Sequence, residues 1–186
     1  MKVFKILLIL FLVSILFSFY VNNNRYIIKV RNKQFSIKKI NDKSDNIAIS
    51  SLSSLSRKMD KLFNILQKYK RKPEVGRLLR SARDIKLEEV NEIYNNKVAY
   101  SINKGEKIGI CVRHNNKKVN ENLLFFVLLH ELAHIMSESY GHTEEFWRNF
   151  KYLIKISIQY KLYNYENYNN NPKHMCGTEI SSTPFP

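Results

Sequence analysis

The feature that most constrains the fold is a run of seven apolar residues, Leu123–Leu129, that leads directly into polar positions. Asn120 precedes the run and is a favourable N-cap, so a helix is expected to begin there. A helix that is apolar on all sides must be buried on most sides. Just beyond the run stand His130, Glu131 and His134, which are costly to bury without a shared purpose.

These polar side chains form the pattern His130-Glu131-Leu132-Ala133-His134. Residues four apart on a helix differ by about 40° in azimuth and one turn in height, so both imidazoles can reach one metal ion. Glu131 lies about 100° further round, where it can act as general base on a zinc-bound water without being a ligand. The pattern predicts a zincin site, in which Zn²⁺ lowers the pKa of that water toward about 7 and polarises the scissile carbonyl. The alternative is a helix with two hydrogen-bonded core histidines.

A catalytic zinc site needs a third protein ligand, and we predict His142. Gly141 can end the helix and turn the chain back, and His142 is the first ligand after that turn. Glu138 would continue the row of the first two histidines along about 12 Å of helix axis, so it cannot converge on the same ion. Glu144 and Glu145 are more distant alternatives, but the dipole of the next helix already explains acidic residues in its first turn.

The stretch LLHELAHIMSESYGHTEEFWRNFKYLIK around this pattern resembles the WLM family and its SprT-like relatives, with the closest likeness to WLM-like metalloproteases of large DNA viruses. The resemblance includes Tyr100–Ile108 and Tyr168–Ile180, covering residues 98–186 well and residues 25–97 loosely. WLM proteins commonly place the third histidine six residues after the second, whereas the gap here is eight. The resemblance implies a minimal zinc protease that acts on DNA-associated proteins. It also implies a peptide-binding edge strand just before the active-site helix, here Ile108–Arg113.

The N-terminal segment Ile6–Val21 contains 16 uncharged, mainly apolar residues and follows Lys2 and Lys5. A membrane-spanning helix needs about 17–25 such residues, and the segment reaches the lower limit if Lys5 snorkels. A cleaved signal peptide is the alternative, but the residues around Ser18 lack the small-residue pair of a cleavage site. We therefore expect residues 1–22 to be an uncleaved membrane anchor.

Lysine and arginine are more numerous after this segment than before it, which predicts a single-pass protein whose body, residues 23–186, faces the cytosol. In the cytosol, Cys111 and Cys176 are expected to remain reduced. Cys111 could be a metal ligand, as in peptide deformylase, but the Gly-rich and Glu-Gly-Cys motifs of that family are missing.

Two short alternating stretches, Arg25–Val30 and Phe35–Ile40, predict a pair of strands. Apolar residues spaced three and four apart predict a helix over Ile47–Tyr69, which Pro73 stops, and a weaker helix over Leu78–Tyr94.

Further along, Val98–Ile102 and Lys107–Arg113 flank Gly105 and predict a hairpin, and Thr143 can cap a helix that follows the active-site helix. The expected fold is α+β: a minimal zincin-like domain, with a small sheet packed on the active-site helix, behind an N-terminal transmembrane helix.

The chain carries 31 Lys and Arg against 16 Asp and Glu, a net charge of +15 that favours an acidic partner. Residues 57–86 are the most basic region. It is interpreted as a solvated helix face, a contact for DNA phosphates or a contact for an anionic membrane. Its basic residues are Arg57, Lys58, Lys61, Lys68, Lys70, Arg71, Lys72, Arg77, Arg80, Arg83 and Lys86.

Two functional hypotheses follow. The first is a membrane-tethered zinc endopeptidase with His130, His134 and His142 as ligands and Glu131 as general base. An oxyanion donor would come from one of five residues, namely Tyr140, Tyr163, Tyr165, Tyr168 or His174. The second is a basic, membrane-bound nucleic-acid- or lipid-binding protein with a structural zinc site, which would be closed and indifferent to Glu131.

Overall fold

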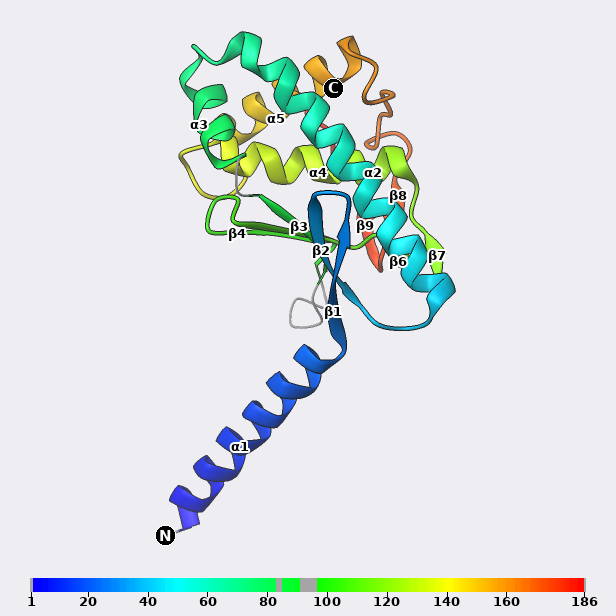
Figure 1. Cartoon of the computed structure of the whole chain (residues 1–186). Coiled ribbons are helices and arrows are strands. Elements are labelled where there is room, and N and C mark those ends of the chain that lie inside the picture. The colour runs from blue at the N-terminus through cyan, green and yellow to red at the C-terminus, as the bar shows by residue number, and fades with distance from the viewer. Residues whose placement is uncertain (1, 83–84, 91–96, 186) are drawn as a thin grey trace.

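The computed structural model of the chain describes residues 2–82, 85–90 and 97–185, and within the first helix it describes side chains only for residues 4–16. The chain is a mixed α/β structure (Figure 1). Its helices are α1 (Lys2–Asn23), α2 (Asp42–Leu66), η1 (Gln67–Tyr69), α3 (Pro73–Ser81), α4 (Glu121–Met136) and α5 (Glu144–Gln159). Its strands are β1 (Arg25–Val30), β2 (Lys33–Lys38), β3 (Lys86–Glu89), β4 (Ala99–Ile102), β5 (Lys107–Ile110), β6 (Arg113–His114), β7 (Lys117–Lys118), β8 (Lys173–Met175) and β9 (Thr178–Ile180).

Five strands form the main sheet, in the order β1-β2-β3-β5-β4. The outer pairs β1/β2 and β4/β5 are antiparallel, whereas β2/β3 and β3/β5 are parallel. The predicted strand pair and the predicted hairpin around Gly105 are confirmed. The expectation that Ile108–Arg113 is the edge strand is wrong, because β5 pairs with β3 on one side and β4 on the other. Strand β4 lies at the edge of the described sheet instead.

The core lies between this sheet and the helices α2 and α4, which cross one of its faces, and α5 packs against α4 (Figure 1). Every residue of Leu123–Leu129 is buried, as an apolar stretch on all sides of a helix requires. The predicted caps are confirmed: Asn120 accepts hydrogen bonds from the N–H groups of Asn122 and Leu123, and Thr143 caps α5.

The helix expected over Leu78–Tyr94 is confirmed only for Leu78–Ser81, the last residues of α3, and is wrong for the later residues that the structure describes. Pro73 begins α3 rather than only stopping the preceding helix, and the chain then forms β3, whose burial alternates along the strand. Residues 83–84 and 91–94 of the expected helix lie outside the described residues. Tertiary pairing of β3 with β2 and β5 overrides the weak helical preference of Lys86–Glu89.

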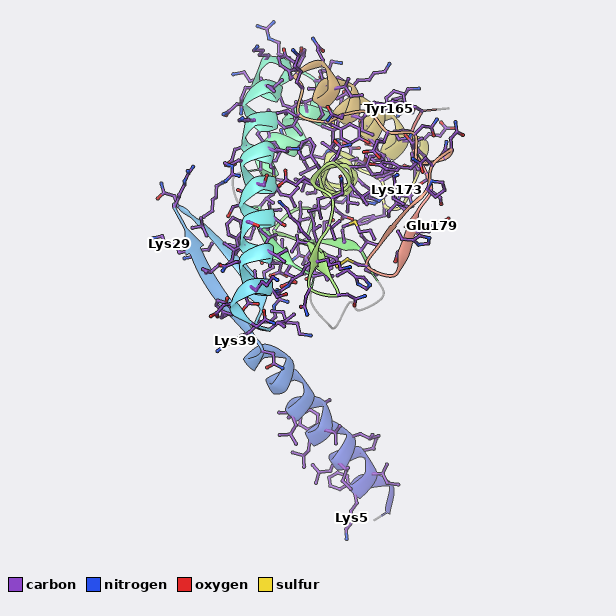
Figure 2. The ribbon with its side chains drawn as sticks, turned by 90° about the vertical axis from the view of Figure 1, so that its right-hand side faces the viewer. Lys5, Lys29, Lys39, Tyr165, Lys173 and Glu179 are labelled. Carbon is purple, nitrogen blue, oxygen red and sulfur yellow. A yellow bond between two sulfur atoms is a disulfide. The ribbon has the colours of Figure 1, made fainter. Side chains whose placement is uncertain are left out.

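Helix α1 extends away from the rest of the chain in both views (Figures 1 and 2). Among the residues that the structure describes, no helix is both long enough and apolar enough to cross a membrane. The transmembrane anchor over residues 1–22, and the single-pass arrangement with a cytosolic body, are therefore wrong predictions. The uncharged run Ile6–Val21 is bounded by Lys5 and Asn22, and its 16 residues span only about 24 Å of a hydrocarbon core about 30 Å thick.

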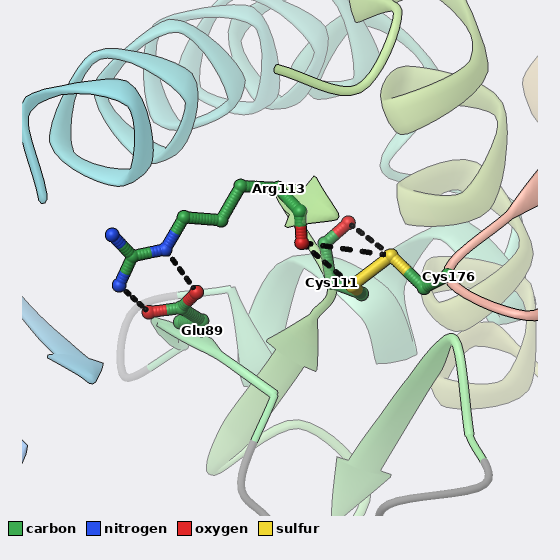
Figure 3. The surroundings of a disulfide bond; sticks show 4 residues. All are labelled: Glu89, Cys111, Arg113 and Cys176. Atoms are coloured by element: carbon green, nitrogen blue, oxygen red, sulfur yellow. Dashed lines mark hydrogen bonds and ion pairs between the residues drawn. A yellow bond between two sulfur atoms is a disulfide. The ribbon is translucent and has the colours of Figure 1, made fainter. Parts of the chain in front are cut away.

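Cys111 and Cys176 form a disulfide, contrary to the expectation of reduced thiols (Figure 3). Their Cα atoms lie 6.5 Å apart, within the usual range for a disulfide. The bond ties the turn between β8 and β9 to the end of β5. The wrong expectation rested on a cytosolic location that was itself inferred from the membrane anchor.

Two residues after Cys111, Arg113 extends a buried guanidinium that pairs with Glu89 (Figure 3) and also reaches Asp45. Its Nε donates to Glu89 Oε1 on β3 at 2.8 Å, and its Nη1 donates to Asp45 Oδ1 on α2 at 2.9 Å. Burial by itself would raise the pKa of Asp45, but hydrogen bonds from Arg113 and from the N–H of Ile40 hold that pKa below its ordinary value. The network fixes the sheet to α2.

Candidate metal centre

Helix α4 carries the first two predicted ligands on one face. His130 and His134 are one turn apart, and their Nε2 atoms lie 3.2 Å from each other. Both side chains are only partly exposed, although the apolar residues around them are fully buried. The spacing alone therefore places two imidazole nitrogens side by side, as the sequence predicts.

The segment between α4 and α5, Ser137–Thr143, brings in the third predicted ligand; we call it the histidine loop. Gly141 adopts φ +78°, in the left-handed region that favours glycine, and the chain turns back there. His142 Nε2 consequently lies 3.1 Å from His130 Nε2. One ring nitrogen from each of the three histidines lies within 4.8 Å of the other two.

These distances fit zinc. Two nitrogens bound to a tetrahedral Zn²⁺ at about 2.0–2.1 Å lie about 3.3–3.4 Å apart, close to the 3.1 and 3.2 Å found here. Burial, followed by the charges of His134 and His142, lowers the pKa of His130 to about 3. Burial, followed by the charges of His142 and Lys104, lowers the pKa of His134 to about 4. Both imidazoles are thus neutral near pH 7, which is the form that binds a metal.

Phe146, in the first turn of α5, forms an apolar wall behind the three histidines. Its ring centroid lies 4.8 Å from that of His130, 4.4 Å from that of His134 and 4.7 Å from that of His142. The side chain is fully buried. From the sequence, Phe146 is only a core residue of α5, because its contact with the histidines depends on how the histidine loop folds.

Glu131 follows His130 on α4, and its carboxyl forms a hydrogen bond with Ser101 on β4. Only 6% of the residue is exposed, and burial raises the pKa of its carboxyl to about 7. A hydrogen bond with the Ser101 side chain and the positive charge of Lys97 oppose that rise. The sequence does not point to Ser101 as a site residue, because only the β4–α4 packing brings it to Glu131.

A cleft of about 280 Å³ lies between the β4–β5 turn and the histidine loop. Its lining residues are Ser101, Asn103, Lys104, His134, Ser139, Tyr140 and Gly141. Of the five residues considered as oxyanion donors, only Tyr140 is among them.

The other four lie elsewhere. The hydroxyls of Tyr163 and Tyr168 face each other in a buried cluster, and Tyr165 packs against Phe185. His174 stands on the β8–β9 hairpin beside Glu179.

The rejected alternative ligands have other partners. Both carboxylate oxygens of Glu145 accept backbone N–H groups of the histidine loop, and these bonds lower the pKa of Glu145 to about 2. Glu138 pairs with Arg77. The thiol of Cys111 is in the disulfide and so is not available to a metal.

The basic region is divided by the fold. Arg77 is held by the histidine loop, Lys58 lies over Phe125, and Arg83 lies outside the described residues. Arg57, Arg80 and Lys86 are exposed at separate places, whereas five exposed basic side chains lie at the end of α2, along η1 and before α3, and we call these five the basic corner. They are Lys61, Lys68, Lys70, Arg71 and Lys72.

Comparison with known proteins gives viral relatives. The chain is 29% identical over 164 residues to "Uncharacterized protein R325" of Acanthamoeba polyphaga mimivirus, which is 81% of this chain and 79% of that protein. It is also 35% identical over 71 residues to "Uncharacterized protein 136R" of Invertebrate iridescent virus 6, and 39% identical over 70 residues to "Uncharacterized protein 042R" of Invertebrate iridescent virus 3. These two matches cover 35% and 32% of this chain, and 38% and 43% of the viral proteins. No family model matches the chain, and no solved structure matches it.

Proposed function

We propose that this chain is a zinc-dependent endopeptidase of the HExxH type. The observation that carries the proposal is the convergence of three imidazole nitrogens, from His130, His134 and His142, within 4.8 Å of one another. The two pairs that include His130 lie at 3.1 and 3.2 Å, close to the separation in tetrahedral zinc. The resemblance of residues 98–186 to WLM and SprT-like proteases favours the same function.

The ligand count favours a catalytic site over a structural one. A structural zinc site is closed by four protein ligands, whereas a catalytic site has three and leaves one position open. Within residues 2–82, 85–90 and 97–185, no fourth histidine, cysteine or acidic ligand atom joins the three histidines. The neighbouring carboxylate of Glu131 has no use in a structural site but is the general base that a hydrolase needs.

Each residue has a distinct part in the proposed reaction. The three histidines hold the ion, which supplies a Lewis acid and a water of lowered pKa when it is bound. Glu131 accepts the proton of the attacking water and delivers it to the leaving amine, and burial brings its pKa close to the working pH for both steps. Tyr140 lines the cleft, where its phenol can donate to the oxyanion.

Strand β4 offers a place for the substrate backbone. Along an antiparallel ladder, residues whose backbone groups bond to the partner strand alternate with residues whose backbone groups face the other way. Val98 is of the first kind, because its C=O accepts the N–H of Cys111. The backbone groups of Ala99 and Ser101 therefore face the free edge, beside the cleft. An extended peptide can add to this edge as a further strand, which selects for flexible or unfolded segments.

The test is zinc analysis of the full chain together with a casein or self-cleavage assay of the parent protein and of Glu131→Gln. We expect bound zinc in both proteins and a loss of hydrolysis of about 10²–10⁴-fold in the variant, the usual contribution of a general base. Equal cleavage rates would refute the mechanism.

The basic corner favours DNA as a partner, which would bring the protease to DNA-associated proteins. Its five exposed cations predict binding that is nearly independent of sequence and weakens steeply with salt. Reversing Lys68, Lys70 and Arg71 to Glu should weaken DNA binding more than reversing the exposed Lys29, Lys33 and Lys117. If the parent chain does not bind DNA at about 50 mM salt, the basic corner is a solvated surface and not a DNA-binding site.

A further inference from the structure

The histidine loop carries His142, the one predicted ligand that is not fixed by the geometry of a helix. Charged side chains from three other elements contact this loop. We propose that Glu145, Lys104 and Arg77 form a clamp that positions His142 and so sets the metal affinity of the site. The inference rests on the proposed function in one respect, namely that the three histidines are metal ligands.

The loop needs such a clamp because, apart from the contact of His142 with Phe146, little apolar burial holds it. Residues 138–143 are exposed or only partly buried, and 84% of Tyr140 is exposed. An added Cβ on Gly141 would meet no heavy atom within 4 Å, so this turn is open on its outer side. A mobile loop would have to be ordered each time a metal bound, and the lost conformational entropy would weaken the affinity.

Glu145 holds the loop from α5. Its Oε1 accepts the N–H of Glu138 at 2.9 Å, and its Oε2 accepts the N–H of Ser139 at 3.0 Å and the Ser139 hydroxyl at 2.7 Å. The Ser139 hydroxyl also lies 2.7 Å from that of Thr143, the N-cap of α5. The carboxylate therefore binds the start of the loop directly and reaches Thr143 at its end through the Ser139 hydroxyl.

Lys104 holds the loop from the β4–β5 turn. Its Nζ donates to the carbonyl oxygens of Ser137, Glu138 and Ser139, at 2.9, 3.2 and 3.4 Å. These carbonyls follow the C-terminal end of α4, where a positive charge is favourable. The same ammonium lies 4.3 Å from the ring centroid of Tyr140.

Arg77 holds the loop from α3. Its guanidinium donates to the carbonyl oxygen of Met136 and to the carboxylate of Glu138, and it lies 3.7 Å from Glu145. It balances the negative charge that Glu138 and Glu145 bring together. The peptide groups on both sides of Glu138 are thus fixed by contacts with the β4–β5 turn and α5, and α3 binds the Glu138 side chain and the Met136 carbonyl.

The sharpest test removes one acceptor from Glu145. In Glu145→Gln, the carboxamide has one acceptor oxygen, and its NH₂ must face a backbone N–H, so one of the two loop bonds is replaced by a repulsive contact. We expect the dissociation constant for Zn²⁺, measured on the full chain by competition with a chromophoric chelator, to rise about 10–100-fold. Lys104→Met should act in the same direction. Glu144→Gln, in the same turn of α5, and Lys117→Met, on β7, are the matched controls and should stay within about twofold of the parent.

A second measurement separates positioning from general destabilisation. If Glu145 acts through His142, Glu145→Gln should have no further effect on zinc affinity in a His142→Ala background, whereas an independent structural effect would add. If Glu145→Gln fails to fold, Glu145→Asp retains the charge but is too short to span both N–H groups, and it should show the same loss. A parent chain that binds no zinc would overturn the proposed function. A parent that binds zinc, with clamp variants within twofold of it or with additive effects, would overturn the clamp alone.

Discussion

The apolar wall behind the histidines gives the sharpest prediction about stability. Phe146 is fully buried and packs against His130, His134, His142 and Phe150, with ring centroids 4.4–5.7 Å away. Its replacement by alanine removes the ring from a site that is enclosed on all sides. Such large-to-small changes cost about 3–5 kcal/mol in the free energy of unfolding.

In a chain of this length, 1 kcal/mol shifts the melting temperature by about 2–4 °C, so Phe146→Ala should melt about 6–20 °C below the parent. The assay is thermal and urea unfolding of the metal-free chain, which separates packing from zinc binding. Ile27→Ala is the control, because Ile27 is 70% exposed on β1 and should change stability by less than about 0.5 kcal/mol. A loss below about 1 kcal/mol for Phe146→Ala would show that α5 does not pack on the histidines as described.

Two further predictions concern the loop and the disulfide. Backbone hydrogen bonds from Ser139 and Glu138 lower the pKa of Glu145 from 4.5 to about 2, so its stabilising effect is full above about pH 4.5 and is lost as the pH falls toward about 2. The difference in unfolding free energy between the parent and Glu145→Gln should therefore shrink across that window, and a constant difference down to about pH 2 would contradict the assignment. Replacing Cys111 and Cys176 by serine opens a loop of 65 residues and should cost about 4 kcal/mol by the chain-entropy relation, measured by urea unfolding under non-reducing conditions. Equal stability of this variant and the parent would argue against the disulfide.

Much of the site was predictable because it depends on local geometry. The four-residue spacing of His130 and His134 fixes their common face wherever the helix lies. The caps Asn120 and Thr143 act within three residues of themselves, and a turn at Gly141 needs only a positive φ. For the same reason the sequence predicts the hairpin around Gly105 and the arrival of His142 after the turn.

The tertiary structure decided everything that joins distant segments. Strand β3 exists because β2 and β5 pair with it, and its insertion moves the edge of the sheet to β4. The disulfide joins residues 65 apart, and Ser101 reaches Glu131 only through the packing of β4 on α4. Weak local preferences do not specify such pairings.

The roles of individual charges were decided in the same way. From the sequence, Glu145 is an ordinary acidic residue in the first turn of a helix, Lys104 is a turn residue and Arg77 is one cation in a basic run. The fold brings all three to the same few peptide groups, which lie at the exposed end of a buried helix and would otherwise be solvated only by water. The sequence by itself predicts which groups would bind a metal, because ligand spacing is a local property of a helix and a turn. The tertiary structure determines how firmly they are held, because that depends on contacts between segments far apart in the chain.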